Sequence, residues 1–247
     1  MSLLKLSGVT RSFGGVRAVD GVSFALEAGS VTALIGPNGA GKSTLFNLID
    51  GQLSLDAGAI AYSEAGLAGL STAARTRLGI GRTFQVSRVF GSMTVLQNAQ
   101  LARQAALGAA YSIGAPLPRQ EEQSARELLV QVDLEEHAAQ PAAALAYGDV
   151  KRLELGLALA SSPRLLLMDE PTAGMAPGER VVLMERVVGL ARDRGLTVLF
   201  TEHSMEVVFG FAQRLLVLSR GRLIADGAPQ DVRADATVQA VYLGSEG

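Results

Sequence analysis

The sequence contains the glycine-rich loop Gly36-Pro-Asn-Gly-Ala-Gly41-Lys42-Ser43-Thr44, which matches the motif G-x-x-x-x-G-K-[ST]. Before it comes the apolar run Val31-Thr-Ala-Leu-Ile35, which is typical of a strand buried on both faces of a parallel sheet. After it, Ser43 to Ile49 has a helical pattern. Glycines at these positions let backbone amides wrap a phosphate at the positive end of the new helix. We therefore predict a phosphate-binding loop in which Lys42 reaches the β- and γ-phosphates and Ser43 binds Mg²⁺.

A second apolar run, Arg164-Leu-Leu-Leu-Met168, is followed directly by the two carboxylates Asp169 and Glu170. In doubly wound sheets the chemistry lies at the carboxyl ends of the strands. An Asp at such an end can hold the Mg²⁺ shell, and the next residue can aim at the attacking water. Two acids after an apolar run also fit a solvated strand end, so this prediction depends on the phosphate loop.

The segment Leu145-Ala-Tyr-Gly-Asp149 precedes a helical run from Val150 to Ala160. A glycine at the start of a helix can form a second anion site, because the first backbone amides of the helix are free to donate. The same pattern also fits a simple helix cap.

Composition and charge exclude several classes of protein. The chain has 247 residues, of which 24 are acidic and 22 basic, a formal net charge of −2 and no cysteine. A chain without cysteine has no disulfide scaffold and no zinc ribbon, and the near-neutral charge argues against a protein that coats nucleic acid. The N-terminus lacks the features of a signal peptide, and the most apolar stretches, 150–168 and 181–201, are interrupted by charges. We therefore expect a soluble, cytoplasmic protein whose apolar residues form its core.

Strand-like and helical patterns alternate along the chain, as in βαβ units with a parallel sheet. Between about 86 and 160 the composition shifts to Ala, Leu, Gln, Glu and Arg, which predicts a helical insertion in one domain that spans 1–247. The patterns further predict strands at Leu3 to Val9, Val22 to Leu26, Leu196 to Thr201 and Leu215 to Leu218, and helices at Gly178 to Arg194 and Arg233 to Gly244.

The order of these motifs resembles the ATP-binding subunit of ABC transporters over essentially the whole chain. The resemblance rests on the phosphate loop, Arg82-Thr-Phe-Gln85, Leu145 to Asp149, Leu165-Leu-Leu-Met-Asp-Glu-Pro171 and Thr201-Glu-His-Ser204. It implies an α/β P-loop fold of the ABC ATPase type, with a mainly parallel core sheet, an N-terminal antiparallel β subdomain and a helical subdomain at 86–160. It also implies ATP and Mg²⁺ as cofactors, and ATP hydrolysis coupled to transport.

The resemblance also implies roles for individual residues. Glu170 matches the general base, His203 the switch histidine at the γ-phosphate, and Phe13 the aromatic residue that stacks on adenine. The implied catalytic residues are Lys42, Glu170 and His203, and the implied metal ligands are Ser43, Gln85 and Asp169. The implied nucleotide-binding residues are Phe13, Gly36, Pro37, Asn38, Gly39, Ala40, Gly41, Lys42, Ser43, Thr44 and Gln85. The signature residues, which would complete the ATP site of the opposite subunit, are Leu145, Ala146, Tyr147, Gly148 and Asp149.

Without the resemblance, each single residue has a plainer interpretation. Phe13 fits a staple on the small sheet, Gln85 a polar loop residue, and His203 a polar residue at the end of a strand. Two segments also depart from the commonest family pattern. The signature reads Leu-Ala-Tyr-Gly-Asp rather than Leu-Ser-Gly-Gly-Gln, so Ala146 lacks a hydroxyl for the γ-phosphate, and Ala176 stands where Asp is frequent.

The Leu-Ala-Tyr-Gly segment, Thr-Glu-His-Ser-Met205 and the Tyr-Leu-Gly244 ending are similar to importers of branched-chain amino acids and of urea or short amides. The ATPase of lipopolysaccharide export is the alternative within the family, and a non-transport ABC switch is the alternative outside transport. The implied partners are polytopic permease subunits, a second ATPase subunit (identical or a paralogue) and, indirectly, a periplasmic or extracellular substrate-binding protein, with no nucleic acid. The implied location is the cytoplasmic side of the inner membrane, where partner subunits hold the chain.

Overall fold

The computed structural model describes residues 2–83, 89–108 and 119–243 of the chain. Its main sheet has the strand order β10-β9-β3-β8-β7-β6. Neighbouring strands from β9 to β6 run parallel, and β10 runs antiparallel to β9. The strands of this sheet are β3 (Val31–Ile35), β6 (Ile80–Arg82), β7 (Leu165–Asp169), β8 (Thr197–Thr201), β9 (Arg214–Ser219) and β10 (Arg222–Gly227). The predicted mainly parallel core sheet is therefore confirmed.

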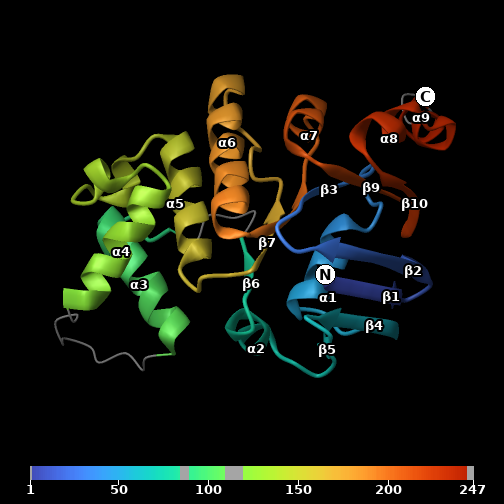
Figure 1. Cartoon of the computed structure of the whole chain (residues 1–247), viewed down its shortest axis with the longest axis horizontal. Coiled ribbons are helices and arrows are strands. Elements are labelled where there is room, and N and C mark those ends of the chain that lie inside the picture. The colour runs from blue at the N-terminus through green and yellow to red at the C-terminus, as the bar shows by residue number, and fades with distance from the viewer. Residues whose placement is uncertain (1, 84–88, 109–118, 244–247) are drawn as a thin grey trace.

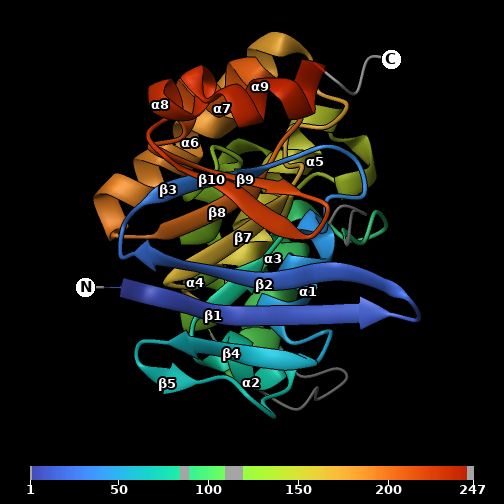
Figure 2. The ribbon, with the colours of Figure 1, turned by 90° about the vertical axis from the view of Figure 1, so that its right-hand side faces the viewer.

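A second sheet is antiparallel and has the order β2-β1-β4-β5. Its strands are β1 (Ser2–Phe13), β2 (Val16–Glu27), β4 (Ala57–Tyr62) and β5 (Ala65–Gly66). Figure 2 shows this sheet with its strands across the view, and α8 and α9 lie at the opposite end of the molecule. The predicted N-terminal antiparallel sheet is confirmed.

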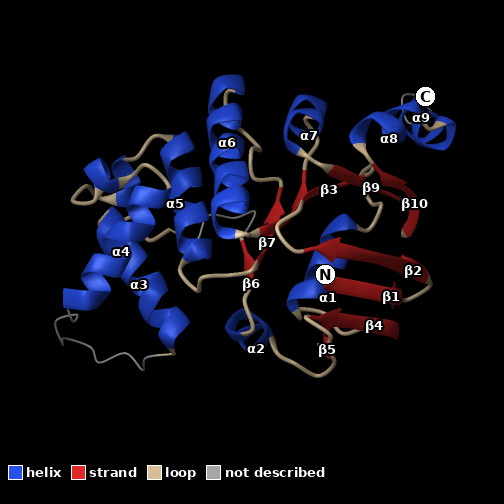
Figure 3. Ribbon diagram, viewed as in Figure 1, coloured by secondary structure: helices blue, strands red, loops and turns tan. Residues whose placement is uncertain are grey.

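The helices gather in groups around the two sheets (Figures 1 and 3). Helices α3, α4 and α5 contact one another and form an all-helical region at one end of the molecule. The α-helices are α1 (Lys42–Asp50), α2 (Thr72–Arg77), α3 (Val95–Leu107), α4 (Arg119–Gln131), α5 (Tyr147–Leu159), α6 (Pro177–Arg194), α7 (Met205–Phe211), α8 (Pro229–Ala234) and α9 (Ala236–Leu243). Short 3₁₀ turns at Glu135–His137 and Ala142–Ala144 connect α4 to α5.

Both faces of the main sheet are covered, as the run Val31 to Ile35 predicts. Ala33 and Ile35 belong to a hydrophobic cluster with residues of α3 to α6. Leu34, which points to the other face, belongs to a second cluster with residues of α1 and the antiparallel sheet. Helix α1 is thus packed between the two sheets, and this fixes the phosphate loop that precedes it.

Several predicted element boundaries were wrong. Strands β1 and β2 are longer than the predicted runs, because irregular register at Leu6/Val9 and Val9/Arg11 lets the hairpin continue through polar residues. The predicted C-terminal helix is two helices, since the Asp235 side chain accepts hydrogen bonds from the amides of Thr237 (2.7 Å) and Val238 (3.1 Å) and starts a new helix.

Several short elements were not predicted. They are α2, β4, β5, β6, α7 and β10. The helical pattern at 86–160 covers α3 to α5, whereas the division of the chain into subdomains stays a prediction. Within the described ranges, no helix is long and apolar enough to cross a membrane.

Candidate functional site

The phosphate loop links β3 to α1 and is packed so closely that glycine is required at its ends. At Gly36 a Cβ atom would lie 2.1 Å from the carbonyl oxygen of Leu218, and at Gly41 it would lie 2.2 Å from that of Ala18. Gly41 also has a φ of +105°, which disfavours residues with a side chain. The loop is therefore held against β9 and β2, while Asn38 and Gly39 at its tip are exposed.

Lys42 begins α1 and its side chain turns back into the loop. Its Nζ donates to the carbonyl oxygens of Gly36 at 2.6 Å and Pro37 at 3.2 Å. Burial lowers the pKa of Lys42, and the nearby carboxylates of Glu170 and Asp169 partly oppose this shift. The ammonium group therefore contacts the loop and lies within electrostatic range of the two acids at the end of β7.

Asp169 and Glu170 occupy the carboxyl end of β7, as predicted. Asp169 is buried, and its Oδ1 accepts a hydrogen bond from Thr201 Oγ1 at 2.8 Å. The amide of Glu170 donates to the same hydroxyl and to the Thr201 carbonyl oxygen, both at 3.1 Å. Glu170 has a φ of +49°, an uncommon value for a residue with a side chain. Thr201, at the end of the neighbouring strand β8, thus fixes both acids.

His203 lies beside Glu170. Its Nε2 is 2.9 Å from Glu170 Oε1, and its ring is half exposed. The adjacent Glu202 is buried and accepts hydrogen bonds from the amide (2.8 Å) and hydroxyl (2.7 Å) of Thr172. This contact joins the segment after β8 to the segment after β7, so that His203 and Glu170 are held together.

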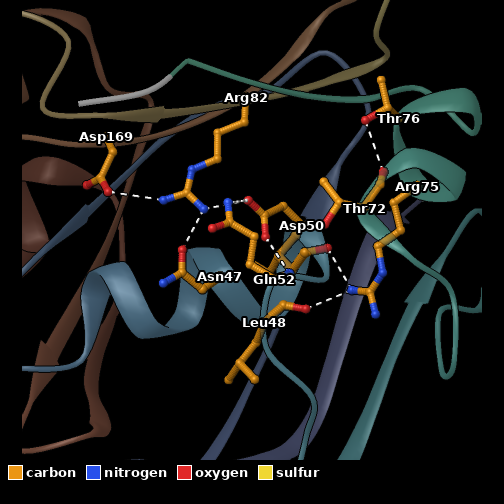
Figure 4. Close-up of polar contacts among 10 residues, drawn as sticks. Asn47, Leu48, Asp50, Gln52, Thr72, Arg75, Thr76, Arg82 and Asp169 are labelled. Atoms are coloured by element: carbon orange, nitrogen blue, oxygen red, sulfur yellow. Dashed lines mark hydrogen bonds and ion pairs between the residues drawn. The ribbon is translucent and has the colours of Figure 1, made fainter. Parts of the chain in front are cut away.

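Arg82, at the end of β6, extends its side chain towards Asp169 (Figure 4). One guanidinium nitrogen is 3.3 Å from Asp169 Oδ2, and the other donates to Asp50 at 2.5 Å and Asn47 at 2.7 Å. Asp50 and Asn47 belong to α1, the helix that begins with Lys42. Arg82 therefore connects the acid at the end of β7 to the helix behind the phosphate loop.

The predicted signature residues lie at the start of α5, apart from the groups above. Ala146 is the N-cap residue and makes no side-chain cap. Tyr147 Oη donates to the Ala173 carbonyl oxygen at 3.0 Å, in the loop that follows Glu170. Asp149 forms an ion pair with Arg152 one turn later. Gly148 is buried, and a Cβ atom there would lie 2.8 Å from Glu179 Oε1.

Phe13 and Gln85 are predicted residues that lie outside the phosphate loop, the ends of β7 and β8 and the signature segment. Phe13 ends β1, is 46% exposed, and has the guanidinium of Arg11 5.0 Å from its ring centre. An exposed ring at the tip of a hairpin is free to stack on a planar ligand. Gln85 falls at 84–88, outside the described residues.

The oxygen donors at the site fit Mg²⁺. Mg²⁺ in nucleotide enzymes binds one or two protein carboxylates together with substrate phosphates. Ser43 is exposed in the first turn of α1, and the Asp169 carboxylate is held in place by Thr201 and Arg82. These donors match the predicted metal ligands Ser43 and Asp169 in type.

A groove lies between the core and the helical region. It has a volume of about 590 Å³ and is lined from one side by α2 and β6 and from the other by α3 and α5. Apolar side chains that line it include Phe90, Leu101 and Leu157, and Asp50 and Arg82 also line it. The groove is thus connected to Asp169 through Arg82, which lines the groove and contacts the Asp169 carboxylate.

The structure brings together Lys42, Asp169, Glu170 and His203, and it adds residues that sequence reasoning missed. These are Arg82, Asn47, Asp50, Thr172, Thr201 and Glu202. Their only signal in the sequence is that each lies within or next to a predicted motif or element, and that signal does not say which side chains will point inward.

Comparison with known proteins supports the family that the motifs indicate. The family model described as ABC transporter matches residues 19–173, and the one described as Branched-chain amino acid ATP-binding cassette transporter matches residues 222–247. The high-affinity branched-chain amino acid transport ATP-binding protein LivG of Salmonella typhimurium is 37% identical, over 98% of each chain. The lipopolysaccharide export system ATP-binding protein LptB of Escherichia coli is 34% identical, over 100% of this chain and 99% of the relative.

A solved structure extends the likeness to three dimensions. The ADP conformation of MJ1267, an ATP-binding cassette of an ABC transporter, has a TM-score of 0.88, 31% identity and 99% coverage of both chains. Together with the motif geometry, these matches identify the chain as a member of the ATP-binding subunits of ABC transporters, in the branched-chain amino acid group.

Proposed function

We propose that the chain binds ATP with Mg²⁺ and hydrolyses it to drive a transporter that imports branched-chain amino acids or related small amides. The observation that carries the hydrolytic function is the convergence of Lys42, Asp169, Glu170 and His203 at one end of the main sheet. The amino acid class rests on the family match and the signature pattern.

In this proposal the residues of the chain act on ATP in distinct ways. The loop amides and Lys42 bind the β- and γ-phosphates and stabilise the charge on the transferred phosphoryl group. Glu170 orients or deprotonates the attacking water, and His203 keeps Glu170 in position through the contact at 2.9 Å. Phe13 stacks on the base. Mg²⁺, held by Ser43, Asp169 and Gln85, would neutralise phosphate charge.

The working unit is a head-to-tail dimer in this proposal, with each ATP between the Lys42 loop of one subunit and the Gly148 helix start of the other. The exposed start of α5 supports this arrangement, because Ala146 and Tyr147 face solvent on the described chain. ATP then drives association by binding the closed dimer better than the open one. The second subunit is this chain or a paralogue.

The groove between α2, β6, α3 and α5 is the proposed contact with the permease. It is apolar at its walls, and Phe90 at its rim is 55% exposed. Large exposed apolar side chains around a groove are typical of interaction sites. Through this contact the chain would be held at the cytoplasmic face of the membrane, with the helical region at 86–160 as the moving part.

Lipopolysaccharide export is the second candidate function, since LptB is nearly as similar in sequence. The match of residues 222–247 to the branched-chain amino acid model favours import. We infer no role as a nucleic-acid switch, because the net charge of −2 offers no bulk attraction for a polyanion.

The test of the hydrolytic function is Glu170→Gln. ATP binding should persist, turnover should fall by about 10²- to 10⁴-fold as expected for a lost general base, and a dimer should accumulate with ATP. Light scattering after gel filtration measures the dimer, and Glu136→Gln, at an exposed position outside the site, is the matched control. Turnover at the wild-type rate in Glu170→Gln would show that Glu170 is not the general base.

A further inference from the structure

Arg82 is a nearly buried cation that no predicted role explains. Its side chain is 11% exposed, and its two nearest acids, Asp50 and Asp169, are 5% and 7% exposed. The Arg82 backbone pairs with Leu167, two residues before Asp169, in the parallel ladder between β6 and β7. The side chain therefore starts beside β7 and extends to the end of that strand.

The contacts of Arg82 are divided between two elements (Figure 4). Its NH2 group contacts Asp169 Oδ2 at 3.3 Å, while its NH1 group donates to Asp50 at 2.5 Å and Asn47 at 2.7 Å. Asp50 is itself fixed by the amide (3.0 Å) and side chain (2.7 Å) of Gln52. Because the α1 end of this bridge is rigid, the position of the guanidinium limits where the Asp169 carboxylate can lie.

The remaining oxygen of Asp169 is also restrained. Thr201 Oγ1 donates to Oδ1 at 2.8 Å, so the carboxylate is held from both sides. Groups that hydrogen-bond a metal ligand from behind set its orientation, and their loss commonly weakens metal affinity.

We propose that Arg82 is a positioning residue, which holds the Asp169 carboxylate at the correct place for Mg²⁺ by bridging it to the C-terminal end of the phosphate-loop helix. The proposal rests on the ATP-dependent function proposed above. Arg82 acts through Asp169 and does not touch the nucleotide. Both acids contact the same guanidinium, so a neutral side chain cannot serve them together, and a lysine keeps the charge without the forked geometry.

A purely structural arginine lies next to it and serves as a control. Arg75 donates to the carbonyl oxygens of Leu48 (2.7 Å) and Ile49 (2.9 Å) at the same end of α1. Its other bonds go to Leu67 and Leu70 carbonyl oxygens, at 3.0 and 3.1 Å. Arg75 therefore stabilises α1 as Arg82 does, but its hydrogen bonds go to backbone carbonyls and not to Asp169.

The experiment compares Arg82→Gln, Arg82→Lys and Arg75→Gln in the full chain. Binding of a fluorescent ATP analogue is titrated with and without Mg²⁺, and the Tm is measured without nucleotide. Arg82→Gln should raise the Mg²⁺ concentration for half-maximal binding by about tenfold or more, with analogue affinity in EDTA unchanged. Arg82→Lys should restore part of the loss. Arg75→Gln should lower the Tm and leave the Mg²⁺ dependence as in the wild type.

Two results would overturn the proposal. One is an unchanged Mg²⁺ dependence in Arg82→Gln and Arg82→Lys, which would leave Arg82 a structural role only. The other is a lower half-saturating Mg²⁺ concentration, which would mean that Arg82 only repels the metal. If Arg82→Gln fails to fold, Arg82→Lys is the test, and it should still raise the half-saturating Mg²⁺ concentration, by less. A wild-type chain that binds no ATP analogue would instead refute the proposed function.

Discussion

Ala146→Ser is the substitution that best tests how α5 takes part in the ATP site. Ala146 is the N-cap residue of α5, with φ −65° and ψ 157°, values that suit a capping serine. Its methyl group is exposed, so a hydroxyl has room. A serine at this position can accept a hydrogen bond from an amide in the first turn, which alanine cannot do.

Two effects of different size are expected. A serine in place of alanine at an N-cap stabilises a helix by about 1 kcal/mol, which corresponds to a rise in Tm of about 2–4 °C for a chain of this size. If the hydroxyl also bonds the γ-phosphate held by the partner subunit, it adds about 1.5–3 kcal/mol to the closed state. That free energy strengthens ATP-dependent closure by about ten- to a hundredfold.

The two effects are measured separately, by calorimetry without nucleotide and by the KM for ATP. Ala228→Ser is the matched control, since Ala228 is the exposed N-cap of α8, with φ −64° and ψ 148° and no side-chain cap. Both variants should melt at a higher temperature, and only Ala146→Ser should lower the KM. A Tm rise in both with equal KM values would refute the contact between Ala146 and ATP.

Five further variants, in three sets, test the geometry of the site. Gly39 lies in open space at φ +76°, so Gly39→Ala should cost about 1–2 kcal/mol in the free energy of unfolding. In Gly41→Ala the new methyl group would meet a backbone carbonyl, and this variant should lose ATP binding. Equal effects of the two variants in urea titration would contradict the described loop packing. Thr201→Val should leave a buried oxygen of Asp169 unsatisfied, which should cost about 1–3 kcal/mol in the free energy of unfolding and most of the ATPase rate. Thr201→Ser should restore both. A Thr201→Val variant with ATPase activity would disprove the role of the shared hydroxyl. Tyr147→Phe loses one exposed hydrogen bond and should cost at most about 1.5 kcal/mol in the free energy of unfolding by urea titration. A much larger loss would show that the hydroxyl does more than donate to the Ala173 carbonyl oxygen.

The elements that carry motifs could be predicted from the sequence because their patterns are strong and local. Val31–Ile35 and Leu165–Asp169 are buried along their whole length, so the apolar run and the strand coincide. The glycines of the phosphate loop could also be predicted, since a loop that wraps an anion needs positive φ angles and space at the backbone. By contrast, β4 has the sequence Ala57-Gly-Ala-Ile-Ala-Tyr62, and its strand forms because β1 offers an edge to pair with.

The interactions among functional residues could not be predicted in the same way. Arg82 and Asp50 are 32 positions apart, and the ion pair exists only because β6 ends beside the C-terminal end of α1. Glu202 and Thr172 are 30 positions apart and meet because β7 and β8 are neighbours in the sheet. Sequence patterns describe neighbours along the chain, and these pairs depend on strand order.

Strand order also explains how Glu170 is held in an unfavourable backbone conformation. A φ of +49° costs a non-glycine residue about 1–3 kcal/mol, and such a conformation persists only where several contacts fix it. Here the Glu170 amide donates twice to Thr201, its carbonyl oxygen accepts from the amide of Ala173 at 3.1 Å, and its carboxylate meets His203. Since Thr201 Oγ1 also donates to Asp169, one residue of β8 positions both the proposed metal ligand and the proposed base. The strain at Glu170 is therefore tied to the same hydroxyl that orients Asp169, so a displacement of β8 relative to β7 would misplace both carboxylates at once.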